Sequence, residues 1–273
     1  MMESKMTAEQ SVARVKARIS NRQSLSPKVI SIARSMAFAS VAASSPTKEM
    51  DAVVLANTLI GYGEKITLEN MAIIENLIKF AKLEASFEVP QNDPRAWYLA
   101  FLQCMDEVGC FVADSGYTEY DKSTRNLTMD NIVVDIVKAG IEAAKAAVPA
   151  AAVFSVITDS TLDALKKEPE AINLFNREVT KDRGVKLAIM PCDQLDNGII
   201  MTSLTSIDSI GDNKETAPLF FNWKASNRNT FRGTAYITFN PLRYAALKND
   251  LEEYLGDHFK AALSKRFERR KKK

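Results

Sequence analysis

Three cysteines and one histidine are the residues that could supply nucleophilic or metal-binding chemistry in this 273-residue chain. Cys104 and Cys110 lie on one predicted helix, about 240° apart around its axis, and cannot form a disulfide bond there. Cys192 differs, because the sequence Pro191-Cys192-Asp193 ends a predicted strand. A thiol at a strand end could act as a nucleophile or carry an acyl group, although a small buried core residue is the commoner role.

The other candidates for chemistry have structural explanations. His258 lies beside the apolar stripe of a predicted terminal helix, where a histidine is usually structural. The Ser-x-x-Lys pattern at 45–48 coincides with a predicted helix start, which favours capping. The acids and phenols between 114 and 121 lack the spacing of a calcium loop. Glycine-rich phosphate motifs, a nucleophile elbow and a His-Glu-x-x-His pattern do not occur, so we predict no catalytic residue and no metal site.

Positive charge gathers at the C-terminal end of the sequence. The last nine residues have a net charge of +6, so the first 264 residues sum to −4. Such a tail could contact anionic lipid headgroups, at about 1 kcal/mol per basic residue, or it could simply keep the chain in solution. The acidic remainder offers no broad positive face, so nucleic acid is not an expected partner. The candidate contact residues are Lys265, Arg266, Arg269, Arg270, Lys271, Lys272 and Lys273.

Targeting signals are not evident. The first residues lack the continuous apolar stretch of a secretory signal. The longest apolar, uncharged stretch runs from Ala146 to Ile157, whereas a membrane-spanning helix needs about 20 residues. We therefore predict no signal peptide and no transmembrane helix, and a protein that is cytoplasmic or released by a non-Sec route. The 146–157 stretch is either a buried connection or a segment that leaves the core to enter a bilayer.

Helical spacing dominates the first 150 residues. A capping box at Thr7-Ala8-Glu9-Gln10 opens the first helix, and Ser-Pro or Thr starts precede several others. Gly61-Tyr62-Gly63 is expected to end the third helix. Residues 114–125 are predicted to form a polar loop. The predicted helices lie near 7–23, 26–41, 46–60, 67–81, 93–113 and 128–149.

Beyond Pro149 the pattern changes. The run 150–157 fits either a buried strand or a helix, and short helices are predicted at 160–167 and 170–179. Turn-forming connections between the later apolar runs favour an antiparallel meander. A long amphipathic helix is predicted after Asn240-Pro241. The predicted strands, rich in β-branched and aromatic residues, are Val185–Met190, Ile199–Ile207, Leu219–Ala225 and Thr230–Phe239.

This order of elements predicts the α+β class, with an N-terminal helical bundle and a small antiparallel C-terminal β-sheet closed by a long amphipathic helix. Pro149 is the predicted boundary between a helical region, 1–149, and a mixed region, 150–273, which could also form one continuous domain. Phe221 and Trp223 share one strand face and Phe220 points the other way, so the sheet could be apolar on both faces. Such a sheet could serve core packing or line a lipid-binding pocket.

In outline, the chain resembles the palmitoylated virulence factors of Erwinia-type bacteria. The shared features are the size, the helical first half and the late cysteine in Pro191-Cys192-Asp193, without a shared motif. The resemblance extends over the whole chain. It implies a fatty acyl group on Cys192, lodged in an apolar cavity.

Three classes of function remain open. The first is a non-enzymatic protein that interacts with membranes or lipid, such as a virulence- or toxin-type effector, which the cationic end and the apolar segment favour. The second is a protein–protein interaction module or structural component. The third is an enzyme of an unusual class that uses Cys192. We favour the first, with anionic lipid or a protein as partner and no cofactor beyond a covalent fatty acyl group.

Overall fold

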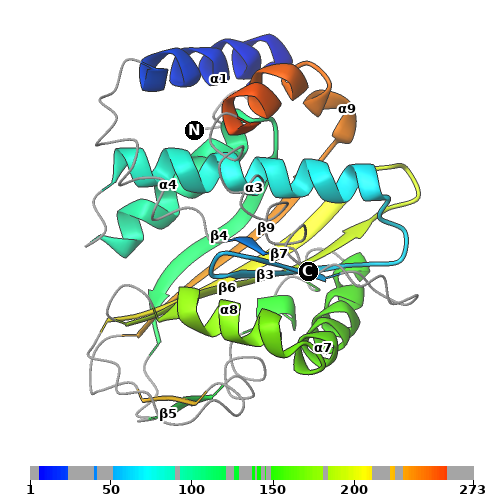
Figure 1. The fold of residues 1–273 in the computed structure, drawn as a ribbon. Helices are drawn as coiled ribbons and strands as arrows, with labels where there is room; N and C mark the ends of the chain where they lie inside the picture. Colours follow the sequence, from blue (N-terminus) through cyan, green and yellow to red (C-terminus); the bar gives the residue numbers. More distant parts are fainter. Residues whose placement is uncertain are drawn as a thin grey trace, which may run out of the picture. The chain divides into compact units, whose positions relative to one another are not determined.

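The computed structural model (Figure 1) has α+β architecture, as the sequence predicts. It divides into two compact units, each assembled from separate stretches of the chain. The helical unit comprises Met1–Ala37, Leu68–Cys110 and Asn240–Lys273, and the sheet unit comprises Phe38–Thr67 and Phe111–Phe239. Pro149 lies within the sheet unit. The structure describes residues 6–23, 40–41, 52–89, 93–120, 126–128, 137–138, 140–142, 145, 149–180, 184–210, 222–224 and 230–256.

The helices of the helical unit start where their caps predict. At the first start, Thr7 Oγ1 accepts a hydrogen bond from Gln10 N at 3.2 Å, and Gln10 Oε1 accepts one from Thr7 N at 2.9 Å. At the third, the Asp93 carboxylate accepts a hydrogen bond from Ala96 N at 2.9 Å, with Pro94 in the first turn. The helices are α1 (Ala8–Gln23), α3 (Leu68–Glu88), α4 (Pro94–Glu107), α9 (Pro241–Tyr244) and a further helical stretch at 248–256.

The core of the helical unit forms where α3 packs against α4. The predicted apolar stripe of α3 is buried, including Leu77 and Ile78. Tyr244 of α9 is buried as well, and its hydroxyl accepts a hydrogen bond from Asn76 Nδ2 of α3 at 3.0 Å. Leu251 and Leu255 are buried on the expected stripe of the terminal segment. The rest of the predicted terminal helix, from residue 257, lies outside the described residues.

The sheet unit is built on a seven-stranded sheet in the order β1-β2-β3-β6-β7-β9-β4. The strands β6, β7 and β9 form the predicted antiparallel meander, β4 pairs antiparallel with β9, and β3 pairs parallel with β6. The predicted strand around residue 223 instead pairs with β5 in a separate two-stranded sheet. The strands are β1 (Ser40–Val41), β2 (Ala52–Leu55), β3 (Thr58–Tyr62), β4 (Phe111–Glu119), β5 (Asn126–Thr128), β6 (Gly184–Gln194), β7 (Ile200–Ile210), β8 (Asn222–Lys224) and β9 (Thr230–Phe239).

The helix predicted at 46–60 is wrong where the structure describes it. Residues 52–62 form the antiparallel hairpin of β2 and β3. Ala56 has a φ of 53°, which an α-helix cannot contain. Asn57 Nδ2 donates a hydrogen bond to the Lys186 carbonyl at 3.1 Å, which ties the turn to the distant strand β6.

Two further predictions for the first half are corrected. The polar loop predicted from residue 114 is largely occupied by β4, an edge strand whose register shifts between Ala113 and Gly116. Thr128 ends the strand β5 rather than capping a helix. Most of the helices predicted near 26–41 and 128–149 lies outside the described residues.

One face of the seven-stranded sheet packs against α7 (Val153–Lys166) and α8 (Pro169–Val179), which lie side by side below it in Figure 1. The ambiguous run from residue 150 is helical: a short 3-10 helix, η2 (Pro149–Ala152), leads into α7. Phe154 and Ile157 are fully buried against this face, although Val156 is 57% exposed. The described part of the apolar segment therefore places one side of the helix in the core, and Ala152 and Val156 lie on the exposed side. Among the described residues, no helix is long and apolar enough to cross a bilayer.

Candidate functional site

Cys192 lies inside β6 rather than at the end of a strand. The strand continues to Gln194, so the prediction of a strand-end thiol is wrong. Cys192 faces Tyr62 of β3 on one side and Thr202 of β7 on the other. Directly opposed residues in a sheet share a face, so these side chains project together with Ile237 of β9. Cys192 is therefore central in the sheet, and its exposed fraction is 0%.

Burial holds the Cys192 thiol in its neutral form. It raises the pKa of the thiol to about 12, and the Thr202 hydroxyl only partly opposes this. The Cys192 Sγ–H points to the Met190 carbonyl at 3.6 Å, a weak hydrogen bond. Burial also raises the pKa of Cys104 to about 12 and that of Cys110 above its ordinary value. All three cysteines are free and buried, so none has the exposed, low-pKa surroundings of a reactive thiol.

The sheet face that carries Cys192 is apolar around the thiol. The cross-strand register places side chains from β3, β6, β7 and β9 on this face, and those near Cys192 are buried. The opposite face is the one that packs against α7 and α8, so this sheet is apolar on both faces. The sequence-based suggestion concerned other residues: Trp223 lies in the separate two-stranded sheet, and Phe220 and Phe221 lie outside the described residues. The buried apolar neighbours on the Cys192 face include Ile60, Met190, Leu204, Ala235 and Phe239.

The other residues singled out from the sequence fall mostly outside the described residues. This applies to the basic tail at 265–273, to His258 and to the pattern at 45–48. It also applies to Phe220 and Phe221, whereas the backbone of Trp223 belongs to β8. Within the described part of the chain, no group of three or more histidine, cysteine or acidic side chains could hold a metal ion.

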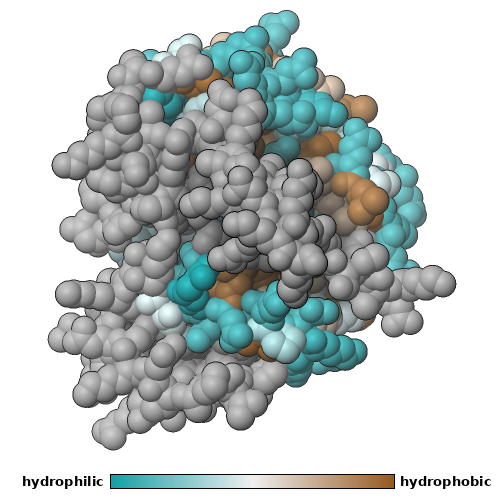
Figure 2. Space-filling model, in the orientation of Figure 1, coloured by the Kyte–Doolittle hydropathy of each residue, from teal (hydrophilic) through white to brown (hydrophobic). Residues whose placement is uncertain are grey.

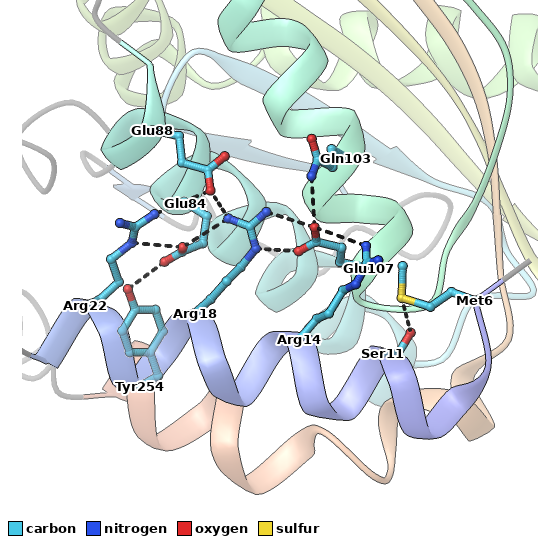
Figure 3. A network of polar contacts seen from close by, with 10 residues as sticks. All are labelled: Met6, Ser11, Arg14, Arg18, Arg22, Glu84, Glu88, Gln103, Glu107 and Tyr254. Carbon is cyan, nitrogen blue, oxygen red and sulfur yellow. Dashed lines mark hydrogen bonds and ion pairs between the residues drawn. The ribbon is translucent and has the colours of Figure 1, made fainter. Parts of the chain in front are cut away.

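A cluster of charges in the helical unit was not found from the sequence (Figure 3). Arg18 of α1 lies between Glu107 of α4 and Glu88 of α3, with its Nε and Nη1 donating to their carboxylates, and its Nη2 donates to Glu107 Oε1 at 3.0 Å. Arg22 Nε donates to Glu84 Oε2 at 3.1 Å, and Arg14 Nη1 lies 3.9 Å from Glu107 Oε1. We call these residues the arginine–glutamate network: Arg14, Arg18, Arg22, Glu84, Glu88 and Glu107.

Two neutral side chains complete the bonding of the buried carboxylates. Tyr254 donates its hydroxyl hydrogen to Glu84 Oε1 at 2.8 Å, and Gln103 Nε2 donates to Glu107 Oε1 at 3.1 Å. Burial raises the pKa of Glu84 above its usual range, although Arg22 and Tyr254 oppose this. Burial has the same tendency at Glu107, but the hydrogen bonds from Arg18 and Gln103 and the charges of Arg18 and Arg14 together outweigh it and lower the pKa of Glu107. Glu107 is thus held ionised by its arginine partner.

The arginine–glutamate network left a signal in the sequence. Arg14, Arg18 and Arg22 are spaced by four residues, and so are Glu84 and Glu88, which places each set on one helix face. That spacing alone is typical of a solvated helix face. The partnership became visible only when the fold brought α1 to α3 and α4.

Five large apolar side chains are exposed on the described surface. On the face drawn in Figure 2, hydrophilic side chains dominate the described residues. The large apolar side chains that are exposed come from α3, α4, β4, α7 and α9. They are Leu68, Leu99, Phe111, Val156 and Leu242.

Comparison with known proteins yields little. No family model and no curated protein matches the chain. A solved structure described as that of the Evf virulence factor is similar, with 14% sequence identity and a TM-score of 0.33. The match covers 78% of this chain and 85% of that one. This chain therefore has a weak structural resemblance to a virulence factor, at a level that establishes neither a shared fold nor a shared function.

Proposed function

We propose that this chain is a non-enzymatic, lipid-interacting protein of the virulence-effector type, in which Cys192 carries a fatty acyl group in thioester linkage. The observation that supports the proposal is the position of Cys192, fully buried at the centre of an apolar sheet face. A saturated acyl chain bound to Sγ would leave the sulfur among apolar side chains. Such surroundings favour a hydrocarbon over water.

The surroundings of Cys192 favour a thioester over a thiolate. The thiol pKa of about 12 reflects the cost of a buried negative charge, and a thioester carries no charge. In the acylation step, Cys192 Sγ attacks the carbonyl of an acyl thioester donor. The bond between the acyl group and the donor sulfur breaks, and the donor leaves as a free thiol with the Cys192 proton. We place this step before β6 is covered during folding, because the folded thiol is buried and neutral.

Burial would also protect the product. Hydrolysis of a thioester requires water or hydroxide at the carbonyl carbon, and the Cys192 side chain has no exposed surface. An acyl group attached there would persist in the folded protein. The same burial disfavours the alternative in which Cys192 acts as an enzymatic nucleophile, because that role needs an accessible thiolate.

Intact-mass measurement of the purified full chain tests the proposal directly. We expect an added mass of one fatty acyl group that neutral hydroxylamine removes from the unfolded chain. The added mass should be absent from Cys192→Ser and retained in Cys104→Ser and Cys110→Ser, which replace the other two buried cysteines. A bare wild-type chain from the native host, or an added mass that persists in Cys192→Ser, would refute acylation at this residue.

Contact with membranes is the second part of the proposal. An acyl chain held inside the fold is not available to a bilayer, so membrane contact needs another signal, such as a polybasic segment attracted to anionic lipid. We propose that Lys265, Arg266 and the basic residues 269–273 supply it. Removal of 265–273 should weaken binding to vesicles with anionic lipid and reduce its salt sensitivity. Recovery of a protein partner, with no lipid binding by the acylated chain, would support an interaction module instead.

A further inference from the structure

The inward face of α1 carries charge where a helix of a globular protein usually carries apolar residues. Ser11, Val15, Arg18 and Arg22 follow one another along one side of the helix, and this side is turned toward α3 and α4. Val15 is the only apolar side chain of α1 that is fully buried. The arginine side chains at the other two positions are only 13% and 17% exposed. Ion pairs rather than apolar packing therefore hold much of α1 in place.

An interface made of ion pairs differs from an apolar one in the free energy of separation. The attraction between buried opposite charges is largely offset by the cost of removing both from water, so the net gain is small. When α1 moves away as a whole, its arginines return to water, and so do the glutamates that it covered. Separation therefore leaves no buried charge without its partner. Deletion of one side chain of an ion pair would leave such a charge. A helix held in this way can open locally while the remaining structure stays folded.

The two most buried glutamates, Glu84 and Glu107, keep neutral partners of their own when α1 leaves, and Glu88 is already 33% exposed. The Tyr254 hydroxyl bonded to Glu84 comes from the terminal segment, and the Gln103 amide bonded to Glu107 comes from α4 itself. Neither belongs to α1. One further ion pair of α1, between Lys16 and Asp250 at 3.4 Å, involves partly exposed side chains and adds little. The surface beneath α1 therefore remains hydrogen-bonded in both states.

We propose that α1 is a releasable helix that binds anionic phospholipid, and that the arginine–glutamate network holds it closed in the absence of a bilayer. Guanidinium groups bind carboxylate and phosphate with the same two-pronged geometry, so lipid phosphates compete directly for the arginines of α1. The helix carries four basic residues and one acid, Glu9. Its apolar residues Val12, Val15 and Ile19 recur at helical spacing, as in helices that lie in a membrane interface.

This inference concerns the same bilayer as the proposed function but requires neither the acyl group nor the basic tail. It is therefore tested in the full chain with Cys192→Ser, which removes the acylation site. The probe is a set of phosphatidylcholine vesicles with or without phosphatidylserine. Every variant retains the tail, so differences between variants report on α1.

Two sets of substitutions break the same ion pairs with opposite expected effects. Glu84→Gln with Glu107→Gln loosens the arginine–glutamate network and leaves every charge of α1 in place, so binding to phosphatidylserine vesicles should rise about fivefold or more. Arg14→Gln, Arg18→Gln and Arg22→Gln together also loosen the network but remove three cations, so binding should fall by about a hundredfold, at roughly fivefold per basic residue. Asp163→Asn, which breaks an exposed pair with Lys166, is the matched control and should change nothing.

Equal binding by the glutamate and arginine variants, or increased binding by both, would overturn the inference. Hydrogen exchange of the Cys192→Ser protein provides a test that does not depend on how the variants fold. Without vesicles, the amides of α1 should exchange faster than those of α3 and α4. Phosphatidylserine vesicles should uncouple Arg18 from Glu107, and exchange in the last two turns of α4 should increase. Uniform exchange across the three helices, unchanged by vesicles, would also overturn it.

Discussion

Asp208 is a carboxyl group whose surroundings oppose its charge. Burial on β7 raises its pKa to about 6, and Lys186, whose Nζ lies 4.0 Å from Oδ2, only partly compensates. Asp208 Oδ1 accepts no hydrogen bond within the described part of the chain. The folded protein therefore binds the proton of Asp208 more tightly than the unfolded chain does. The free-energy cost of ionising Asp208 in the folded protein is absent well below the ordinary pKa of aspartate and complete above about pH 6. The free energy of unfolding therefore falls as the pH rises through this range.

Replacement of Asp208 by asparagine should therefore stabilise the protein at neutral and alkaline pH. We expect the free energy of unfolding of Asp208→Asn to exceed that of the wild type by about 1 to 3 kcal/mol at pH 8. The difference should vanish below about pH 3, where the wild-type carboxyl is protonated in both states. Urea unfolding at several pH values measures it. Asp196→Asn is the control, because Asp196 is 92% exposed and its ion pair with Lys65 contributes little; an equal gain there would contradict the explanation.

Close packing against a strand backbone makes Gly61 of β3 hard to replace. A Cβ atom there would overlap the hydroxyl of Thr161 and lie 3.1 Å from Ile157 Cγ2. We expect Gly61→Ala to lower the free energy of unfolding by about 1 to 3 kcal/mol, as overpacked cores do. Thr161→Ala should partly rescue it in a double-mutant cycle. Gly116→Ala, whose Cβ would meet only Thr234 Oγ1 at 3.6 Å, should cost far less, and equal losses would exclude steric overlap as the cause.

At the level of elements, the sequence predicted best those features that neighbouring residues determine. The capping box at Thr7 and the Asp93 cap mark helix starts correctly, and the alternation in 230–239 marks β9. The β2–β3 hairpin was missed, because its apolar residues also fit a helical stripe. Two features favour strands over a helix here: the turn at Ala56 and the hydrogen bond from Asn57 to β6. That hydrogen bond joins residues far apart in sequence. The position of Cys192 inside β6 was missed for the same reason, because its pairing with Tyr62 of β3 joins residues far apart in sequence.

Acid should loosen α1 before the other helices. The Glu107 carboxylate, whose pKa is lowered chiefly by Arg18, stabilises the docked helix above the ordinary glutamate pKa, and this contribution is lost as the pH falls through the lower, folded value. Hydrogen-exchange protection of α1 should therefore decrease at pH 3 relative to pH 7, after correction for intrinsic rates. Protection of α8, which has no part in the arginine–glutamate network, is the control. A parallel decrease in both helices would indicate global unfolding.

At the level of the whole molecule, the sheet unit draws on both halves of the chain. The parallel pairing of β3 with β6 places Gly61 opposite Pro191, and the pairing of β4 with β9 places Phe111 opposite Thr238. Sequence patterns report on neighbours along the chain and contain no direct sign of such pairings. The α+β class could thus be predicted, but the interleaving of the two halves could not.

A fragment that begins at residue 150 should not fold by itself. It retains β6, β7 and β9 but lacks β2, β3 and β4, so both sides of the meander would present unpaired backbone groups and exposed apolar faces. We expect the fragment 150–273 to show no cooperative thermal transition in circular dichroism. The full chain is the reference. A cooperative transition with dispersed amide resonances would contradict the role that we assign to β3 and β4.

The register shift between Ala113 and Gly116 has a consequence for behaviour at high concentration. Among the described strands, β4 is the last on its side of the seven-stranded sheet, and a regular row of unpaired backbone groups at such an edge would invite another molecule to add a strand. The shift twists the strand and interrupts that row in its middle. A strand of a second molecule could form backbone hydrogen bonds with only a few residues at a time. The register shift therefore disfavours the strand addition that leads to fibres.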